Sequence, residues 1–462
     1  MSWESLPVEL HITIFTILLE DYNRENLSAF AFTTVSRKWQ DFFEPIFFRR
    51  LVIGEPDLNR LGSATKGPKG YRFSYIRYLW FRLKLSPYTC YYCQTREPND
   101  IIHQNNARFI RAVCKLLDIL ARGNHTPYYQ GITLQLSAHS SSDYRHKYRD
   151  FRMGDKYPYI TKEDLVDKGE FHRKHRDLSI KYVQDTHPEV VSHQYMAYQP
   201  PEMDRFRSTE PLGFDFRKPL FRWSGVVPGS VDTQQVLPKV NIVEALVIRR
   251  QFYRNISSDA LIKLLRESFL SLETFRDERW LGSNYFNKIL CSPENVIDAL
   301  PPKLQRLHIY QDADSDFSLP RVHSIAGAQS MRKFATLSEL KELSIAPDTD
   351  GWGFLLDFLP IVRRPLDTLP VFKLRRLALD CATLREPEVS FERLVLVRTL
   401  RAAAAAASRM PRLETMELWR ATPSSATLFR YSTKNLESKI TWRINWKHAR
   451  GDQLWQGKLR KD

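Results

Sequence analysis

The first forty residues carry the clearest helical pattern of hydrophobic positions in the chain. Leu10, Ile14 and Leu18 recur every four residues, a spacing that places them along one face of a helix. Pro7 is tolerated in the first turn of such a helix, because the N–H group that it lacks has no partner there. Glu9 suits the positive end of the helix dipole. The pattern predicts an amphipathic helix near the start of the chain.

A polar turn at 21–26 separates this helix from a second patterned stretch. The apolar positions of that stretch are Leu27, Phe30, Val35, Trp39, Phe42 and Phe43. They predict one or two further short helices, which we expect Pro45 to interrupt or to follow. Three small helices of this length cannot bury a convincing core by themselves.

A different phrase recurs along the rest of the chain: an apolar residue, two polar residues, another apolar residue, and usually alternation afterwards. It occurs as IRYLWF (76–81), VEALVI (243–248), LETFRD (272–277), LQRLHI (304–309), LKELSI (340–345), LRRLAL (374–379) and LETMEL (413–418). From position 243 the phrases start roughly 29 to 39 residues apart, which is the self-similarity of stacked repeats. The alternation predicts equivalent strands, with Leu307, Leu343 and Leu377 buried and Arg306, Glu342 and Arg376 exposed.

Helical patterns lie between the phrases. They cover 106–122, 257–269, 292–300 and 391–410, with Ser257 or Ser258 and Ser292 as plausible N-caps. A strand followed by a helix, repeated with short connections, gives parallel strands and a curved stack. The alternating stretch at 439–446 is expected to add a closing strand. The expected fold class is α/β, with a three-helix N-terminus followed by a solenoid of parallel strands and outer helices.

Residues 141–240 break this pattern, being polar, proline-containing and rich in Tyr, Phe and Arg. A long segment of this kind is usually functional or disordered, and we expect an insertion that projects from the stack. It is either a solvated loop or a partner surface, because Tyr and Arg dominate protein-binding hot spots. The candidate substrate-binding residues are Tyr144, Tyr148, Arg149, Phe151, Tyr157 and Tyr159, with Arg173, Lys174 and Arg176 favouring an acidic or phosphorylated target.

The composition narrows the class of protein. A hydrophobic fraction of 43% indicates a globular chain. The net charge of +16 would attract acidic partners, nucleic acid or anionic surfaces, but the basic residues are dispersed, which favours a solvated surface over nucleic-acid binding. Five cysteines indicate a reducing compartment. With no evident secretory signal and no long apolar run, we expect a soluble protein of the cytoplasm, the nucleus or both, with no membrane insertion.

The candidate catalytic and metal motifs are weak. A four-ligand zinc site could be formed by Cys90, Cys93, His103 and Cys114. However, Cys114 lies in the apolar pattern of a helix, where a thiol is an ordinary core residue. The aspartates at 312, 314 and 316 resemble the start of a calcium loop without its glycine and later glutamate. Phosphate-binding, dinucleotide-binding, zinc-protease and nucleophile-elbow motifs are missing. We expect neither a cofactor, a metal nor an enzymatic activity.

The opening residues resemble an F-box. The resemblance rests on Leu6 and Pro7, on Glu9, on the apolar stripe that follows, and on the close at Val35-Ser36-Arg37-x-Trp39. An F-box followed by irregular leucine-rich phrases is similar to the many F-box proteins of filamentous fungi. The regular L-x-x-L-x-L-x-x-N phrase is absent, so curvature and repeat count stay open. The expected divisions are 1–50 (F-box), 51–140 (first repeat-like units), 141–240 (insertion) and 241–462 (leucine-rich-repeat-like solenoid with a C-terminal cap).

The resemblance implies a substrate receptor of a Skp-cullin-F-box ubiquitin ligase, which binds a Skp-type adaptor and, through it, a cullin. The adaptor-contacting residues that it implies are Leu6, Pro7, Leu10, Ile14, Leu18, Val35, Ser36 and Trp39. Some of these must face the internal core of the three helices instead, and Trp39 is expected to do both. Two other functions stay open: an F-box scaffold without ubiquitin ligation, and a basic repeat protein that binds nucleic acid or anionic lipid.

Overall fold

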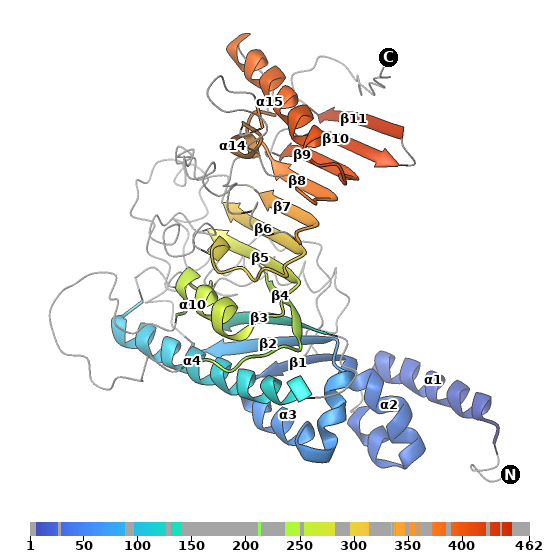
Figure 1. Ribbon diagram of the computed structural model, residues 1–462. Coiled ribbons are helices and arrows are strands. Elements are labelled where there is room, and N and C mark those ends of the chain that lie inside the picture. Colours follow the sequence, from blue (N-terminus) through green and yellow to red (C-terminus); the bar gives the residue numbers. More distant parts are fainter. Residues whose placement is uncertain are drawn as a thin grey trace, which may run out of the picture.

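The computed structural model has a mixed α/β architecture with one long, mostly parallel sheet (Figure 1). The structure describes residues 6–25, 29–87, 97–125, 131–140, 211–213, 236–249, 254–281, 296–313, 334, 337, 339–346, 351–356, 358–359, 372–384, 390–421, 426–434 and 437–445. In these residues the sheet has 11 strands, and their order in space is their order along the chain, from β1 at one end to β11 at the other. The sheet does not close into a barrel within the described residues.

The strands from β1 to β9 are parallel, and β10 and β11 are antiparallel additions. Their bounds are β1 Arg50–Gly54, β2 Tyr78–Leu85, β3 Ile132–Ser140, β4 Val243–Ile248, β5 Thr274–Leu281, β6 Arg306–Ala313, β7 Glu342–Ala346, β8 Arg376–Asp380, β9 Thr415–Ala421, β10 Ala426–Lys434 and β11 Glu437–Asn445. All seven repeated phrases fall on strands, as the alternation predicts. Strands β1, β3, β10 and β11 lie outside the phrases.

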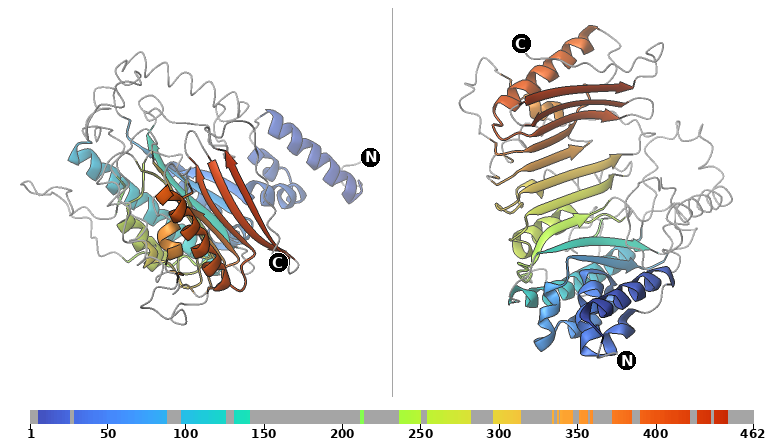
Figure 2. Two further views of the ribbon diagram at one scale, coloured as in Figure 1. Left: turned by 90° about the horizontal axis from the view of Figure 1, so that it is seen from above. Right: turned by 90° about the vertical axis from the view of Figure 1, so that its right-hand side faces the viewer.

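The helices have the following bounds: α1 Val8–Glu25, η2 Ala29–Thr34, α2 Arg37–Arg49, η3 Glu55–Asp57, α3 Leu58–Ala64, η4 Gly67–Ser74, α4 Asn99–Ala121, η6 Arg122–His125, α10 Ser258–Lys263, η9 Leu264–Ser268, α14 Gly351–Leu356 and α15 Ser390–Ser408. Helices α4, α10, α14 and α15 gather on one face of the sheet (Figure 2). In the described residues from β4 to β9, the opposite face carries no helix. We call it the open face.

The predicted helices agree with the structure over most of their length, but the polar turn expected at 21–26 was wrong for 21–25, which belong to α1. Ser257 caps α10, because its side chain accepts a hydrogen bond from the Ala260 N–H at 3.2 Å. The π-helical turn η9 continues α10. Of the helix expected at 292–300, only 296–300 is described, as a short helical turn. The expectation for Pro45 was wrong, because α2 runs through it.

Equivalent positions of neighbouring strands are in register, and this register builds the core. Leu307 pairs with Leu343, and Leu343 pairs with Leu377. All three side chains are buried. Arg306 and Arg376 are exposed, and Glu342 is half-buried. The prediction of equivalent strands with inward leucines is confirmed.

The first apolar residue has a separate role in four of the phrases. Leu304 and Leu340 each precede a strand by two residues, and each donates its N–H to the carbonyl three residues earlier, at 3.1 Å in both cases. Leu272 and Leu413 do the same. All four side chains are buried. The phrase therefore has two apolar positions three apart because one closes the turn into the strand and the other faces the helices.

Parts of the expected insertion belong to the core. Leu212, Leu237 and Val240 are buried in the hydrophobic cluster, although all three fall within 141–240. Leu212 forms an isolated parallel bridge with Ile256, and the Leu237 backbone N–H donates a hydrogen bond to the Glu267 carboxylate at 2.8 Å. The segments 211–213 and 236–240 are thus fixed to the sheet and its helices.

The last three strands close the sheet at its C-terminal end. β11 pairs antiparallel with β10, and Phe429 of β10 meets Trp442 of β11 edge to face, with 6.1 Å between ring centroids. Ile440 and Trp442 pack against the main hydrophobic cluster. A closing strand was predicted at 439–446, and β11 occupies Glu437–Asn445.

Candidate partner-binding surfaces

The N-terminal helices pack around a small aromatic cluster. Phe15 of α1 contacts Phe43 and Trp39 of α2, with ring centroids 5.3 and 4.9 Å apart. Phe32 of η2 contacts the same two rings. Phe15 and Phe43 are buried. These rings hold three short segments together with little other apolar surface.

Much of the remaining apolar surface of this unit faces outward. Few large hydrophobic residues are exposed in the described part of the chain, and those before β1 belong to this unit: Val8 (62%), Leu10 (47%), Ile12 (48%), Ile17 (52%), Val35 (58%) and Ile46 (37%). Leu10, Ile14 and Ile17 follow the i, i+4, i+7 spacing of one helical stripe. We call these three residues the α1 stripe. In the α1 stripe, Leu10 and Ile17 are exposed and Ile14 is half-buried.

The structure places the predicted adaptor contacts in two settings. Pro7, Leu10, Val35 and Ser36 are exposed, and Leu6, Ile14, Leu18 and Trp39 are half-buried. Trp39 packs into the aromatic cluster, so part of it serves the internal core. Ser36 is the N-cap of α2, where its hydroxyl accepts a hydrogen bond from the Trp39 N–H at 3.5 Å. Contact of these residues with an adaptor stays a prediction.

Two features of α1 were missed by the sequence pattern. The buried edge of the helix consists of His11 and Phe15, one turn apart, and not of the leucine and isoleucine stripe. Val8, Ile12 and Ile17 are additional exposed apolar residues. The signal was present, because residues 8–19 are apolar on nearly every side, and such a helix is normally buried on all sides.

A buried ion pair connects the helical unit to the sheet. Glu44 of α2 pairs with Arg72 of η4, and the Tyr71 hydroxyl donates to the same carboxylate at 2.8 Å. The Glu44 side chain is 5% exposed and that of Arg72 is 13% exposed. Burial alone would raise the pKa of Glu44, but hydrogen bonds from Tyr71, Arg72 and Gln40 outweigh it and lower the pKa. The orientation of α2 is therefore fixed relative to the sheet.

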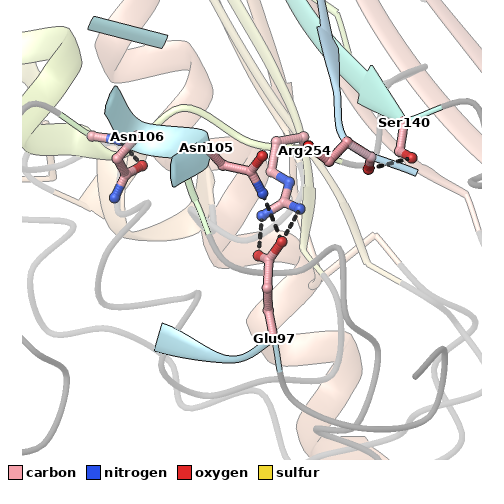
Figure 3. Close-up of polar contacts among 7 residues, drawn as sticks. Glu97, Asn105, Asn106, Ser140 and Arg254 are labelled. Carbon is pink, nitrogen blue, oxygen red and sulfur yellow. Dashed lines mark hydrogen bonds and ion pairs between the residues drawn. The ribbon is translucent and has the colours of Figure 1, made fainter. Parts of the chain in front are cut away.

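A second buried polar cluster ties together segments that are distant in the sequence (Figure 3). Arg254, which follows β4, donates to both carboxylate oxygens of Glu97, at 2.6 and 3.0 Å. Asn105 of α4 donates to the same carboxylate at 2.7 Å, and Asn106 accepts from the Gly213 N–H at 3.0 Å. A bidentate pair with an added amide is a well-satisfied buried charge. Its role is to anchor the start of α4 beside 211–213.

Several candidates from the sequence lie outside the described residues. These are Tyr144, Tyr148, Arg149, Phe151, Tyr157, Tyr159, Arg173, Lys174, Arg176, Cys90 and Cys93, and the aspartates at 314 and 316. Of the remaining zinc candidates, His103 and Cys114 are half-buried on α4, and burial raises the pKa of the Cys114 thiol. No group of three or more metal-ligating side chains occurs in the part of the chain that the structure describes.

Comparisons with known proteins found one similarity, over part of the chain. Residues 299–457 match the model of a family described as a family of unknown function (DUF6546). The match spans the strands from β6 to β11. Neither the curated proteins nor the solved structures gave a match. None of the helices within the described residues is long and apolar enough to cross a bilayer.

Proposed function

We propose that this chain is the substrate-recognition subunit of a Skp-cullin-F-box ubiquitin ligase, working in the cytoplasm, the nucleus or both. In this proposal α1, η2 and α2 form an F-box that binds a Skp-type adaptor, and the repeated strands form a leucine-rich-repeat-like solenoid that carries the substrate. The receptor itself performs no chemistry. It supplies proximity and orientation, while the conjugating enzyme transfers ubiquitin.

The observation that carries the proposal is the uncovered apolar surface of α1. Leu10 and Ile17 are 47% and 52% exposed on the α1 stripe, and Val35 beside α2 is 58% exposed. Burying an aliphatic side chain of this size stabilises an assembly by about 1.5–3 kcal/mol. A helix stripe with this spacing suits docking onto a helical partner.

The Glu44–Arg72 pair supports the same role. A receptor must hold its substrate at a defined position relative to the adaptor, and a hinge between the two regions would lose that positioning. The buried pair and the Tyr71 hydroxyl fix α2 to η4, which lies directly before β2. The adaptor-binding unit and the repeats are therefore expected to move as one body.

Adaptor capture by the purified protein tests the proposal. The variant Leu10→Ala/Ile17→Ala removes two exposed side chains, so we expect little change in folding but a loss of roughly 2–4 kcal/mol in adaptor affinity. Isothermal titration against the adaptor measures this loss. The matched control Leu394→Ala/Val397→Ala truncates two exposed apolar residues of α15 and should leave the affinity unchanged. Equal affinities for both variants, or no binding by the unaltered chain, would remove the F-box assignment.

Two further measurements separate the alternatives. Co-purification of a cullin with the chain from cells distinguishes a ligase receptor from a scaffold without ligation. Binding that weakens steeply with salt would instead favour a phosphate-binding protein, because an apolar helix interface is nearly insensitive to ionic strength.

The expected substrate surface at 141–210 is tested by replacement. We expect that a flexible Gly/Ser linker in place of 141–210 leaves adaptor binding intact and abolishes substrate capture. The replacement stops before Leu212, whose backbone bonds to Asn255 and Ser257 fix that end. Affinity purification with the proteasome inhibited measures the loss of substrates, and an unchanged set of partners would place recognition elsewhere on the sheet.

A further inference from the structure

The last strand of the sheet has one edge without a neighbouring strand in the described part of the chain. Strand β11 pairs with β10 on one side, and it stands at the end of the strand order. The opposite end of the sheet is β1, which lies beside the N-terminal helices (Figure 1). The outer side of β11 is therefore the edge at which a further strand can add to this sheet.

The pairing pattern shows which backbone groups point outward from this edge. The Thr433 N–H of β10 donates to the Glu414 carbonyl at 2.9 Å, on the side of β9, and Thr433 is opposite Ser438 of β11. In an antiparallel ladder, two opposite residues either bond to each other or both point away. The N–H and C=O groups of Ser438 therefore point away from β10, and by alternation those of Ile440 and Trp442 do as well.

The apolar face of the sheet is less completely covered at β11 than at the strands before it. Leu377 of β8 and Met416 of β9 are each 1% exposed. Ile440 continues the same row in register, but it is only half-buried, as are Trp442 and Ile444. A further strand with apolar side chains at this edge would give β11 the coverage that each earlier strand receives from its neighbour.

We propose that β11 pairs with β11 of a second copy of this chain, antiparallel and with Ile440 opposite Ile440 of the second copy. The two chains then share one continuous sheet, with a two-fold axis perpendicular to it between the two Ile440 residues. This axis keeps both apolar faces on the same side, so the row through Leu377 and Ile440 continues into the second copy. The association goes beyond the receptor role and does not depend on it.

The charged residues of β11 favour this register. With Ile440 at the centre, Glu437 of each copy stands opposite Arg443 of the other, because the two positions are symmetric about 440. Both side chains are exposed, and alternation places them on the face opposite Ile440. Opposite charges directly across two strands are favourable. The two-fold symmetry therefore supplies this attractive pair twice.

The neighbouring registers lack this match. Centring on Thr441 would place Lys439 opposite Arg443 of the second copy, and centring on Lys439 would place the two Lys439 residues together. Like charges directly opposite each other are destabilising. Centring on Trp442 would carry the position opposite Glu437 past the end of β11. Charged residues on an edge strand usually discourage pairing, whereas the proposed register turns them into attractive pairs.

Sedimentation velocity of the full-length chain over a range of concentrations tests the proposal, and we expect a monomer–dimer equilibrium. Arg443→Glu places like charges opposite each other twice and should raise the dissociation constant about tenfold or more. Glu437→Arg/Arg443→Glu makes the charges opposite again and should restore most of the affinity. Within one chain the two positions are about 20 Å apart along the strand, so this restoration reports a contact between two chains.

Two further variants separate the register from a general charge effect. Lys439→Glu makes the same change of charge on the same face of β11. It should not weaken the dimer, because Lys439 stands opposite the uncharged Thr441 of the second copy. Ser438→Pro removes an outward N–H and leaves the ladder to β10 intact. It should weaken the dimer about tenfold or more, because symmetry removes two hydrogen bonds.

Several outcomes would overturn the proposal. A monomer at the highest soluble concentration would do so, as would a charge-exchanged double variant that dimerises no better than Arg443→Glu. A dimer formed only after removal of 446–462 would assign the edge to the chain's own segment. Association lost in Leu10→Ala/Ile17→Ala would place it on the α1 stripe instead. Circular dichroism melting verifies that the variants stay folded, and the charge exchange decides the outcome if Ser438→Pro does not.

Discussion

The sheet and the N-terminal helices differ in how completely they bury their apolar side chains. In the sheet, one leucine row runs through Leu307, Leu343 and Leu377, and each member is at most 1% exposed. In α1, four of the aliphatic side chains are about half exposed or more: Val8, Leu10, Ile12 and Ile17. The leucine row is buried within its own chain, whereas the helical unit leaves apolar surface uncovered.

This difference in burial follows from how many apolar neighbours each region provides for its own side chains. A strand added to the stack finds a hydrophobic neighbour on each side, so every repeat extends a continuous core. Three short helices have only a small aromatic cluster, around Phe15 and Phe43, and cannot enclose all their apolar residues. Selection for a self-sufficient fold would replace residues such as Ile17 with polar ones, so their presence favours a partner that covers them.

The largest expected effect concerns the leucine row of the sheet, compared with an exposed leucine elsewhere in the chain. Leu343→Ala should lower the free energy of unfolding by about 2–5 kcal/mol, because it leaves a cavity between β6 and β8. Leu394→Ala on α15, where the side chain is 68% exposed, should change it by less than about 0.5 kcal/mol. Urea denaturation followed by tryptophan fluorescence measures both. A small effect at Leu343 would contradict a tightly packed leucine row.

A second prediction concerns the joint between the two regions. Glu44→Gln removes one charge from the buried pair with Arg72 and leaves that guanidinium without its counter-ion. We expect a loss of about 3 kcal/mol in unfolding free energy. The matched control Glu339→Gln breaks an exposed pair with Lys373 and should cost less than about 1 kcal/mol. Equal losses would show that the joint contributes no more than a surface ion pair.

The same carboxylate predicts a pH dependence. Because the folded pKa of Glu44 is lowered from its ordinary value of 4.5, the unfolded chain binds more protons than the folded one at acidic pH. The stabilisation by Glu44 is therefore present above about pH 4.5 and is lost as the pH falls through the folded pKa. The stability difference between the unaltered chain and Glu44→Gln should shrink over that range. A constant difference down to pH 4 would contradict the lowered pKa.

Strands could be predicted where the local alternation of apolar and polar residues shows directly which side chains are buried. The phrase around Leu307 recurs along the chain together with the apolar residue of its preceding turn. Both the position of the strand and the side chains that it buries could therefore be predicted. β3 alternates in the same way, with Leu134 and Leu136 buried, but it lacks the leading turn residue of the phrase and was missed. β1 is only five residues long and directly follows α2, which leaves too little sequence for a period.

The helical unit was less predictable because its core depends on contacts between helices. Periodicity could not show that Phe15, and not Ile14, would meet Phe43, since both positions fit a helical face. Pro45 was expected to interrupt or to follow a helix, yet α2 continues through it to Arg49, because packing of Phe43 and Phe48 in the interior outweighs one missing hydrogen bond.

The smallest predicted effect separates folding from binding at Ser36. Its hydroxyl accepts from the Trp39 N–H at 3.5 Å, a long hydrogen bond, so Ser36→Ala should cost about 0.5–1 kcal/mol of unfolding free energy through loss of the cap. Ser36→Asp keeps a capping oxygen and should restore that stability. If Ser36 also touches the adaptor, Ser36→Asp will still bind it more weakly, because a charge then enters an apolar interface. Adaptor affinity that recovers together with stability would restrict Ser36 to capping, and would move the adaptor interface toward the exposed stripe of Leu10 and Ile17.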